Sequence, residues 1–352
     1  MPRIGHQGWI ISSSEPILVT GSNGFIGSRV VKVLLDYGFC KIRCFVRPSG
    51  NLRSLRDIIG GAEKNGVEMV EGNLLNPADC ARAMSGISVV YHLAAGMDSS
   101  FAGCFMNSVL TTRNLLDSSL DDRKLKRFVN VSSFAVYSNI YMPRGAMLDE
   151  TAPLEKNPSQ RHDPYGYAKL KQEQLIEKYH RDFGIPYAIV RPGAVYGPGK
   201  SQLTGRIGID TFGVFLHLGG SNQIPFTYVD NCAEAIILAG LVKGVDGEIF
   251  NVVDDDPPIS KDFLHLYKRH MGGFLSVPLP YSLTRMLCSL WESYSNWSKG
   301  QLPPRFNRRQ CAAEWKGNCY SNAKLKEMLG WRPKVSFVEA RKLYFSAMKG
   351  KP

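Results

Sequence analysis

The first two-thirds of the chain alternates short β-rich runs with stretches that have apolar residues at helical spacing. The predicted strands are Pro16–Thr20, Lys41–Val46, Val67–Glu71, Ser88–Leu93, Arg127–Ser132 and Tyr187–Arg191. The predicted helices are Phe25–Tyr37, Asn76–Met84, Phe105–Ser119 and Tyr165–Phe183. Strands that alternate with helices predict an α/β fold, a doubly wound parallel sheet covered by helices on both faces.

The alternation ends after Arg191, where the Gly- and Pro-rich segment Gly193–Gly199 begins. A strand and a helix, Pro225–Val229 and Asn231–Leu241, are predicted to rejoin the sheet, and Gly247–Val252 adds a further strand. We therefore expect a large domain and a smaller, discontinuous one. The expected boundaries are residues 15–192 plus about 225–255 for the large domain, and 193–224 and 256–347 for the smaller one.

Composition and net charge indicate which classes of binding partner to expect. The net charge is +12, but the basic residues are scattered and no nucleic-acid-binding motif accompanies them, so we expect a basic surface that attracts an anionic cofactor and no nucleic acid. The eight cysteines form no CxxC pair. This pattern predicts a reduced, cytoplasmic protein with buried thiols and no metal site.

A membrane partner is not expected from the sequence. No run of eighteen apolar residues occurs, and Met1–Glu15 lacks the apolar core of a secretory signal. The segment Tyr281–Trp297 is amphipathic. We favour its interpretation as a lid over the substrate, with a surface anchor as the alternative.

A glycine-rich turn follows the first predicted strand. Pro16–Thr20 runs directly into Gly21-Ser-Asn-Gly24-Phe-Ile-Gly27, and a predicted helix follows. Glycine permits a tight turn and close approach to a diphosphate, whose charge a helix N-terminus stabilises. The spacing is GxxGxxG, not the common GxGxxG, and an ordinary strand–helix turn is the alternative interpretation.

The end of the second predicted strand bears on the cofactor. An NAD site commonly has a carboxylate there for the ribose 2′-hydroxyl, but this strand ends in Cys44-Phe-Val-Arg47. The Arg47 guanidinium can instead pair with a 2′-phosphate. NADP(H) is therefore favoured and NAD(H) stays open. Alternatively, Arg47 only caps the strand in solvent.

Tyr165 and Lys169 lie one helical turn apart on one face of a predicted helix. A tyrosine titrates near ~10, so it needs a nearby cation to act as a base. Ser133 follows a predicted strand and is placed to stabilise a developing alkoxide. The YxxxK spacing alone is weak evidence, because Tyr167 and Lys171 match it too. The glycine turn, the serine and their order along the chain favour the first pair.

Several motifs occur together, in one order, along nearly the whole chain. They are Thr20–Gly27, Tyr91–Ala95, Asn107 with Asn114-Leu-Leu, Val131–Tyr137, Pro164–Lys169, Arg191–Gly199, Tyr228–Ala233 and Leu329–Pro333. Together they resemble the extended short-chain dehydrogenase/reductase family, of the NAD-dependent epimerase/dehydratase type, from about residue 15 to 347. The resemblance implies a Rossmann fold, hydride transfer with a nicotinamide cofactor and a substrate-binding role for the smaller domain.

The resemblance also implies roles for individual residues. The catalytic residues that it implies are Ser133, Tyr165, Lys169 and Asn107, the last as a structural asparagine near the active site. The cofactor-binding residues are Gly21, Asn23, Gly24, Phe25, Ile26, Gly27, Arg47, Asn73, Leu74, Leu93, Ala94, Ala95, Tyr165, Lys169, Pro192, Gly193 and Val195. Asn73 stands where the family usually has an Asp that contacts adenine.

Departures from the family pattern indicate which of the reactions known for the family to expect. Ser133-Phe-Ala stands where dehydratases of the family carry Thr-Asp-Glu, which disfavours dehydration. Ala194 and Ile224 stand where nucleotide-sugar epimerases carry Asn and Arg, which weakens a sugar-nucleotide substrate. Arg191-Pro-Gly and Thr227–Asn231 are similar to the hydroxysteroid dehydrogenase-like and dihydroflavonol reductase-like branches.

These observations predict an oxidoreductase that interconverts a secondary alcohol and a ketone on a bulky, largely apolar small molecule. A nucleotide-sugar epimerase is the alternative, and a non-catalytic cofactor-binding sensor or scaffold is a third. A homodimer would suit the family's habit. Eight residues are candidates to wall an apolar pocket, with ordinary core packing as the alternative. They are Phe212, Phe215, Leu216, Phe226, Tyr228, Leu287, Leu290 and Trp291.

Overall fold

A computed structural model describes residues 8–60, 66–122, 124–299 and 301–349. Seven parallel strands form its central sheet, in the order β12-β7-β5-β4-β1-β2-β3. They are β1 (Ile17–Thr20), β2 (Ile42–Val46), β3 (Val67–Glu71), β4 (Val89–His92), β5 (Arg127–Val131), β7 (Tyr187–Pro192) and β12 (Glu248–Val252). Each matches its predicted range to within one residue at either end. The doubly wound parallel α/β fold is confirmed.

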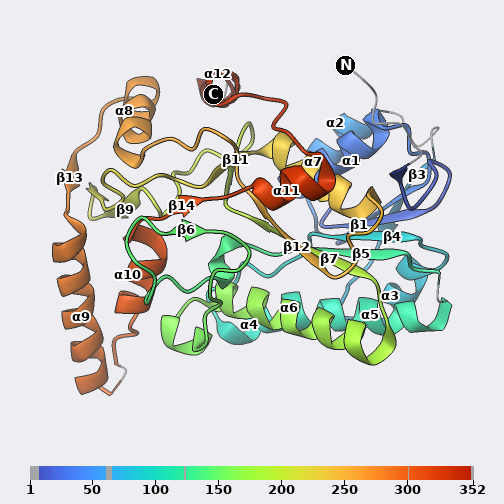
Figure 1. Cartoon of the computed structure of the whole chain (residues 1–352), viewed down its shortest axis with the longest axis horizontal. Helices are drawn as coiled ribbons and strands as arrows, with labels where there is room; N and C mark the ends of the chain where they lie inside the picture. The colour runs from blue at the N-terminus through green and yellow to red at the C-terminus, as the bar shows by residue number, and fades with distance from the viewer. Residues whose placement is uncertain (1–7, 61–65, 123, 300, 350–352) are drawn as a thin grey trace.

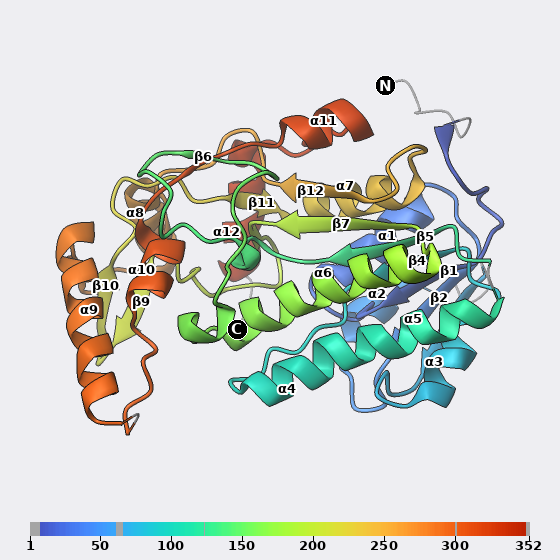
Figure 2. The same cartoon turned by 60° about the horizontal axis from the view of Figure 1, so that its bottom comes forward.

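Helices cover both faces of the sheet (Figures 1 and 2). One layer contains α1 (Gly27–Asp36), α2 (Arg53–Ile59), α7 (Val229–Leu241) and α11 (Ala323–Leu329). The other contains α3 (Pro77–Met84), α4 (Phe101–Phe105), α5 (Thr111–Asp122) and α6 (Pro164–Phe183). The helix predicted at Phe105–Ser119 is in fact α4 and α5, joined by the π-helical turn Met106–Leu110.

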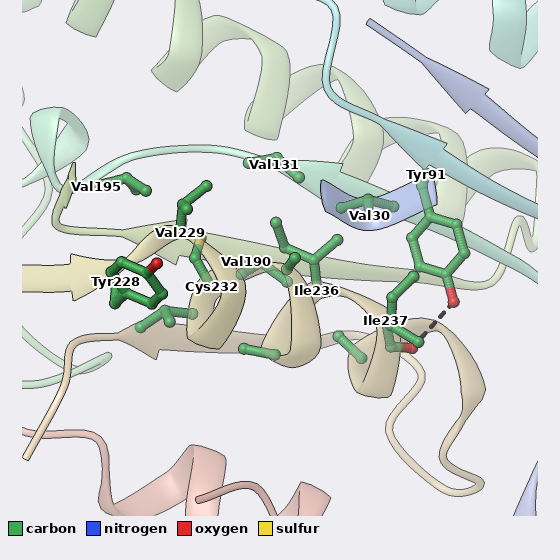
Figure 3. Close-up of a cluster of buried hydrophobic side chains, with 14 of the residues drawn as sticks. Val30, Tyr91, Val131, Val190, Val195, Tyr228, Val229, Cys232, Ile236 and Ile237 are labelled. Atoms are coloured by element: carbon green, nitrogen blue, oxygen red, sulfur yellow. Dashed lines mark hydrogen bonds between the residues drawn. The ribbon is translucent and has the colours of Figure 1, made fainter. Parts of the chain in front are cut away.

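Helix α7 is apolar around nearly its whole circumference because it is buried between the sheet and the outer elements. Figure 3 shows its Cys232, Ile236 and Ile237 among valines of the neighbouring strands. The Tyr91 hydroxyl donates to the Ile237 carbonyl oxygen at 3.0 Å. A Cβ on Gly240 would lie 2.3 Å from that hydroxyl, so only glycine lets the tyrosine ring pack against the helix.

The predicted return of Pro225–Val229 to the main sheet is wrong. Strand β11 (Phe226–Tyr228) pairs instead with β8 (Ala194–Tyr196) in a separate two-stranded sheet. The physical reason is that β12 occupies the outer edge of β7, pairing from Glu248↔Ala188 to Val252↔Pro192. Strand β11 contacts the main sheet through a side chain, since the Thr227 hydroxyl donates to the Val252 carbonyl oxygen of β12.

The remaining elements gather beyond the carboxyl ends of the main strands, at one end of the molecule (Figure 1). A three-stranded sheet has the order β13-β10-β9, and β14 pairs with β6. The strands are β6 (Met147–Leu148), β9 (Gly208–Thr211), β10 (Val214–His217), β13 (Ser276–Pro278) and β14 (Cys319–Tyr320). The helices are α8 (Ser260–Met271), α9 (Tyr281–Trp297), α10 (Arg308–Trp315) and α12 (Phe337–Lys349). The domain boundaries stay a prediction.

Three sequence expectations concern the environment of the protein. All eight cysteines are free thiols, six of them buried. No helix within the described ranges combines the length and apolar character needed to cross a bilayer. In the same ranges, no group of three or more His, Cys, Asp or Glu side chains is placed to hold a metal. The cytoplasmic location stays a prediction, and residues 1–7 of the segment Met1–Glu15 lie outside the described ranges.

A buried ion pair joins α6 to the sheet. Arg191 on β7 donates from Nε and Nη2 to the two carboxylate oxygens of Glu173 on α6, at 2.9 and 2.7 Å, and both residues are 1% exposed. The third nitrogen, Nη1, donates to the Tyr137 hydroxyl at 3.0 Å. That hydroxyl donates to Asn251 on β12. The pair therefore positions α6 against two neighbouring strands.

Glu173→Ala should lower the free energy of unfolding by about 3–5 kcal/mol, because it leaves the buried Arg191 guanidinium without its counter-charge. Asp182→Ala is the matched control, since Asp182 forms surface ion pairs with Lys178 and Arg181 on the same helix. Chemical denaturation monitored by circular dichroism measures both variants. Equal stabilities of the two variants would contradict a positioning role for the buried pair.

Candidate active site

The glycine turn between β1 and α1 has no room for side chains. Gly21 has φ +67°, and a Cβ on it would lie 2.9 Å from the Ala94 nitrogen. A Cβ on Gly27 would lie 2.0 Å from the Gly21 carbonyl oxygen. Gly24 closes the turn, because its N–H donates to that same oxygen at 2.9 Å. The turn therefore places backbone, with no side chain, at the N-terminus of α1.

A cavity of about 390 Å³ opens beside this turn at the carboxyl ends of β1, β2 and β4. Its lining residues are Gly21, Asn23, Gly24, Phe45, Arg47, Ser49, Gly50, Leu74, Leu93, Ala94 and Ala95. No side chain caps the N-terminus of α1. A glycine turn in front of a helix N-terminus that no side chain caps fits a diphosphate, so the residues present fit a dinucleotide.

Eight of the predicted cofactor residues line this cavity. Phe45, Ser49 and Gly50 were missed, although they follow the carboxyl end of β2, where ligands bind in such sheets. Asn73 does not line the cavity; its side-chain oxygen accepts from the Leu75 N–H. Gly193 lines a second pocket, described below, which also contains Ser133 and Tyr165. Other predicted residues lie outside the lining: Phe25, Ile26, Gly27, Pro192 and Val195.

Arg47 lies in the cavity wall as predicted, and the described lining includes no carboxylate. Its Nη2 donates to the Asn107 side-chain oxygen at 3.4 Å. Asn107 belongs to the π-helical turn, and its amide donates to the Gly103 carbonyl oxygen. The structure thus places Asn107 in contact with Arg47 on the cofactor side.

Ser133 and Tyr165 come together as predicted. Ser133 follows β5 and begins a 3₁₀ turn, where its Oγ accepts from the Ala135 N–H at 3.2 Å. Tyr165 lies in the first turn of α6, which Asp163 caps by accepting from the Gly166 N–H. Burial raises the pKa of Tyr165 to about 12, and its hydrogen bond with Ser133 acts in the opposite direction. The phenol is therefore a proton donor at neutral pH.

Lys169 lies beneath the tyrosine and is 2% exposed. Its Nζ donates to the Val131 carbonyl oxygen at 2.7 Å and to Gln172 Oε1 at 3.0 Å, and it lies 5.9 Å from the Tyr165 ring centroid. Burial lowers the pKa of Lys169 to about 8, while the Glu173 carboxylate opposes that shift. In this structure Lys169 therefore meets Tyr165 through a cation–π contact with the ring, while its hydrogen bonds go to Val131 and Gln172.

A buried chain of hydrogen bonds connects the glycine turn to Lys169, and the sequence analysis missed it. The Thr112 hydroxyl donates to the Ser108 carbonyl oxygen, so it accepts from both His92 Nε2 and Gln172 Nε2. The other nitrogen of His92 accepts from Thr20 at 2.7 Å.

The His92 imidazole in this series of hydrogen bonds is neutral. Burial, together with the Lys169 charge, lowers the pKa of His92 to about 3. The Gln172 side chain turns its nitrogen to Thr112 and its oxygen to Lys169. Gln172 therefore positions the ammonium. Its only sequence signal was a polar side chain on the buried face of the predicted helix.

The second YxxxK match has a different environment. The Tyr167 ring packs edge-on against Phe101, and Lys171 donates to Gln174 at the surface. Neither residue lines the pocket that contains Ser133 and Tyr165. The choice of Tyr165 and Lys169 from the two matches thus has geometric support.

Ser133 and Tyr165 open into a substrate-side pocket of about 390 Å³, which lies between the main sheet, the loop before β9 and α10. Its apolar lining includes Phe134, Ile209 and Phe306, and its charged lining comprises Arg206, Arg305, Asp163 and Glu314. Arg206 lies 4.0 Å from the Glu314 carboxylate. A pocket of this size suits a small molecule. The lining combines apolar surface with guanidinium groups, so it is more polar than the sequence predicted.

The predicted apolar wall is wrong, since none of its eight residues lines this pocket. Phe226 and Tyr228 lie in the main core because β11 packs inward. Leu287 and Leu290 are exposed on α9. The helix Tyr281–Trp297 also contributes no residue to the pocket, which leaves the interpretation as a lid without support.

A parallel doubly wound sheet, a glycine turn before α1 and a serine–tyrosine pair above a buried lysine define an extended short-chain dehydrogenase/reductase. The chain belongs to the NAD dependent epimerase/dehydratase family, whose model matches residues 17–252. The protein is therefore an enzyme of a family that uses a nicotinamide cofactor.

Named relatives differ in substrate. The chain is 28% identical to an uncharacterized UDP-glucose epimerase, YtcB, of Bacillus subtilis, over 67% of this chain and 76% of the relative. It is 24% identical to the decarboxylating sterol-4-alpha-carboxylate 3-dehydrogenase of Mus musculus, over 94% and 90%. Among solved structures, UDP-glucuronic acid 4-epimerase from Bacillus cereus, in complex with NAD, matches with a TM-score of 0.69, 23% identity and coverage of 95% and 98%.

Gln172→Leu should move the alkaline limb of the pH profile of kcat/KM to lower pH, because it removes an acceptor that stabilises the charged form of Lys169. Gln172→Glu should move the limb to higher pH, since a carboxylate favours the ammonium. Gln174→Leu, an exposed position on the same helix, serves as the control. A uniform loss of activity, with the limb unmoved in both Gln172 variants, would reveal a merely structural role.

Proposed function

We propose that the protein is an NAD(P)(H)-dependent oxidoreductase that interconverts a secondary alcohol and a ketone. The observation that carries this proposal is that Ser133 and Tyr165 line the same substrate-side pocket. This pocket lies next to the cofactor cavity, and that position supports transfer of hydride between a cofactor and a substrate.

The nicotinamide, when bound, supplies hydride to the carbonyl carbon or takes it from the carbinol carbon. In reduction, Tyr165 gives its phenolic proton to the carbonyl oxygen, and its high pKa keeps that proton available at neutral pH. Ser133 donates a hydrogen bond to the same oxygen as negative charge develops there. The Lys169 ammonium stabilises the phenolate that remains. Oxidation runs through the same groups in reverse.

The cofactor preference proposed here is NADP(H). The cavity wall provides Arg47 at the end of β2, and its described residues include no carboxylate to hold a 2′-hydroxyl. A guanidinium pairs well with a 2′-phosphate, whereas a carboxylate would repel it.

Arg47→Ser should lower kcat/KM for NADPH by about 10- to 100-fold, the range expected for loss of a charged hydrogen bond. The efficiency with NADH should stay the same, because NADH has no 2′-phosphate. Steady-state kinetics with both cofactors measure the ratio, and NADH is the internal control. A parallel loss with NADH would show that Arg47 only supports the fold.

The proposed substrate is a hydroxy or keto acid with a bulky apolar remainder. Phe134, Ile209 and Phe306 offer apolar contacts, and Arg305 offers a partner for a carboxylate. The mouse relative, matched over nearly its whole length, is named for a sterol that carries a carboxylate, which supports this class.

Tyr165→Phe should reduce turnover by about 10²- to 10⁴-fold, because it removes the proton donor while the ring is kept. Affinity for NADPH should be nearly unchanged. Tyr167→Phe is the matched control from the second YxxxK pair and should keep wild-type activity. The measurement is NADPH consumption with a keto-acid substrate, alongside cofactor titration. Near-normal turnover in Tyr165→Phe would overturn the mechanism.

A nucleotide-sugar epimerase is the second candidate, and one observation favours it. The Arg305 guanidinium suits a diphosphate as well as a carboxylate. Such an enzyme oxidises and re-reduces the same substrate, so it should retain its cofactor through purification and show no net NADPH consumption. The turnover assay above therefore separates the two candidates.

A further inference from the structure

Helix α10 borders a cavity on each of two opposite faces. Gln310 and Glu314 line the substrate-side pocket. Arg308, Ala312 and Lys316, the last at the C-terminal end of the helix, line a second cavity of about 500 Å³. These three residues recur at intervals of four, so they share one side of the helix. The second cavity is therefore separated from the active site by the helix itself.

The second cavity lies between α10 and α9, which are neighbours in both views (Figures 1 and 2). We call it the α9–α10 cavity. Helix α9 contributes Tyr281, Arg285 and Glu292, whose spacing of four and seven residues places them on one side of that helix. Ile140, Tyr141, Gln160 and Arg309 complete the lining. A cavity of this volume suits a small molecule.

Two of the four cations in this lining are paired with carboxylates. Arg308 Nε donates to Glu292 at 3.0 Å, and Arg309 Nη1 donates to Glu155 at 2.8 Å. Within the described ranges, no carboxylate lies within ion-pair distance of the other two cations, which belong to Arg285 and Lys316. Four cations against two carboxylates leave two positive charges without a counter-charge.

These two charges lie close together. The Lys316 Nζ donates to the carbonyl oxygens of Asn139 and Ile140, at 3.1 and 3.0 Å, which fixes the ammonium in the wall. An ammonium has three N–H donors, so one is left for a ligand. Burial lowers the pKa of Lys316, and the Arg285 charge lowers it further, because like charges disfavour each other. An anion between them would relieve this repulsion.

We propose that the α9–α10 cavity binds a small molecule that carries a phosphate monoester. Such a group has close to two negative charges at neutral pH, which matches the two uncompensated cations, whereas a carboxylate has one. The planar guanidinium of Arg285 suits two phosphate oxygens at once. Ile140, Tyr141 and Tyr281 offer contact surface to the organic part of the ligand.

The test is isothermal titration calorimetry of the full chain with phenyl phosphate. The wild type should bind one equivalent, and inorganic phosphate should compete for the same site. Phenyl sulfate has a similar shape and a single negative charge, so it should bind about tenfold more weakly or worse. The titrations are repeated with saturating NADPH and with saturating NADH, so that the glycine turn is occupied by cofactor.

Arg285→Gln should weaken binding of phenyl phosphate by about 10- to 100-fold, the range for loss of a charged hydrogen bond. Arg285 is exposed, so this change should leave the fold intact. Arg269→Gln, which removes an exposed arginine from α8, is the matched control and should bind like wild type.

The proposal is overturned if the wild type does not bind phenyl phosphate, if phenyl sulfate binds equally well, or if Arg285→Gln binds like wild type. Loss of binding on addition of cofactor would assign the phosphate to the glycine turn instead. Weakening by Arg305→Gln but not by Arg285→Gln would assign it to the substrate-side pocket, which also contradicts the proposal.

Discussion

The bidentate ion pair between Arg191 and Glu173 fixes where helix α6 lies, and the candidate site depends on that position. Both groups are 1% exposed, so neither has water as an alternative partner. The pair holds α6 against β7, and Tyr137 extends the contact to Asn251 on β12. With α6 held there, its first turn brings the phenol to Ser133 and its second brings Lys169 beneath β5.

The electrostatics of the site follow from burial at that junction. Tyr165 stays protonated, His92 stays neutral, and the Lys169 ammonium is the positive charge between them. The hydrogen bonds through Thr112 and Gln172 satisfy these buried polar groups, which would otherwise destabilise the fold. The same contacts that stabilise the junction therefore also set the protonation states of Tyr165, His92 and Lys169.

Helix α10 lies between the substrate-side pocket and α9. Gln310, Glu314 and Trp315 line the pocket, whereas Cys311 packs in a buried cluster with Cys288 of α9. One short helix thus forms part of the pocket wall and also connects that wall to α9.

Much of the fold was predictable from sequence because its signals are local. Strand-length apolar runs defined the seven main strands, and the glycine turn was recognisable because a backbone that admits no Cβ requires glycine. The order of Ser133, Tyr165 and Lys169 along these elements was sufficient to place the serine and tyrosine together.

Tertiary structure alone decided which face each apolar side chain presents and which distant groups meet. Phe226 is core whereas Leu290 is exposed, and nothing in their local sequence distinguishes them. Gln172 reached Lys169 and Thr112, and β11 left the main sheet, through contacts between segments far apart in the chain. Periodicity reports which side of an element is apolar, but only packing between elements determines what covers it.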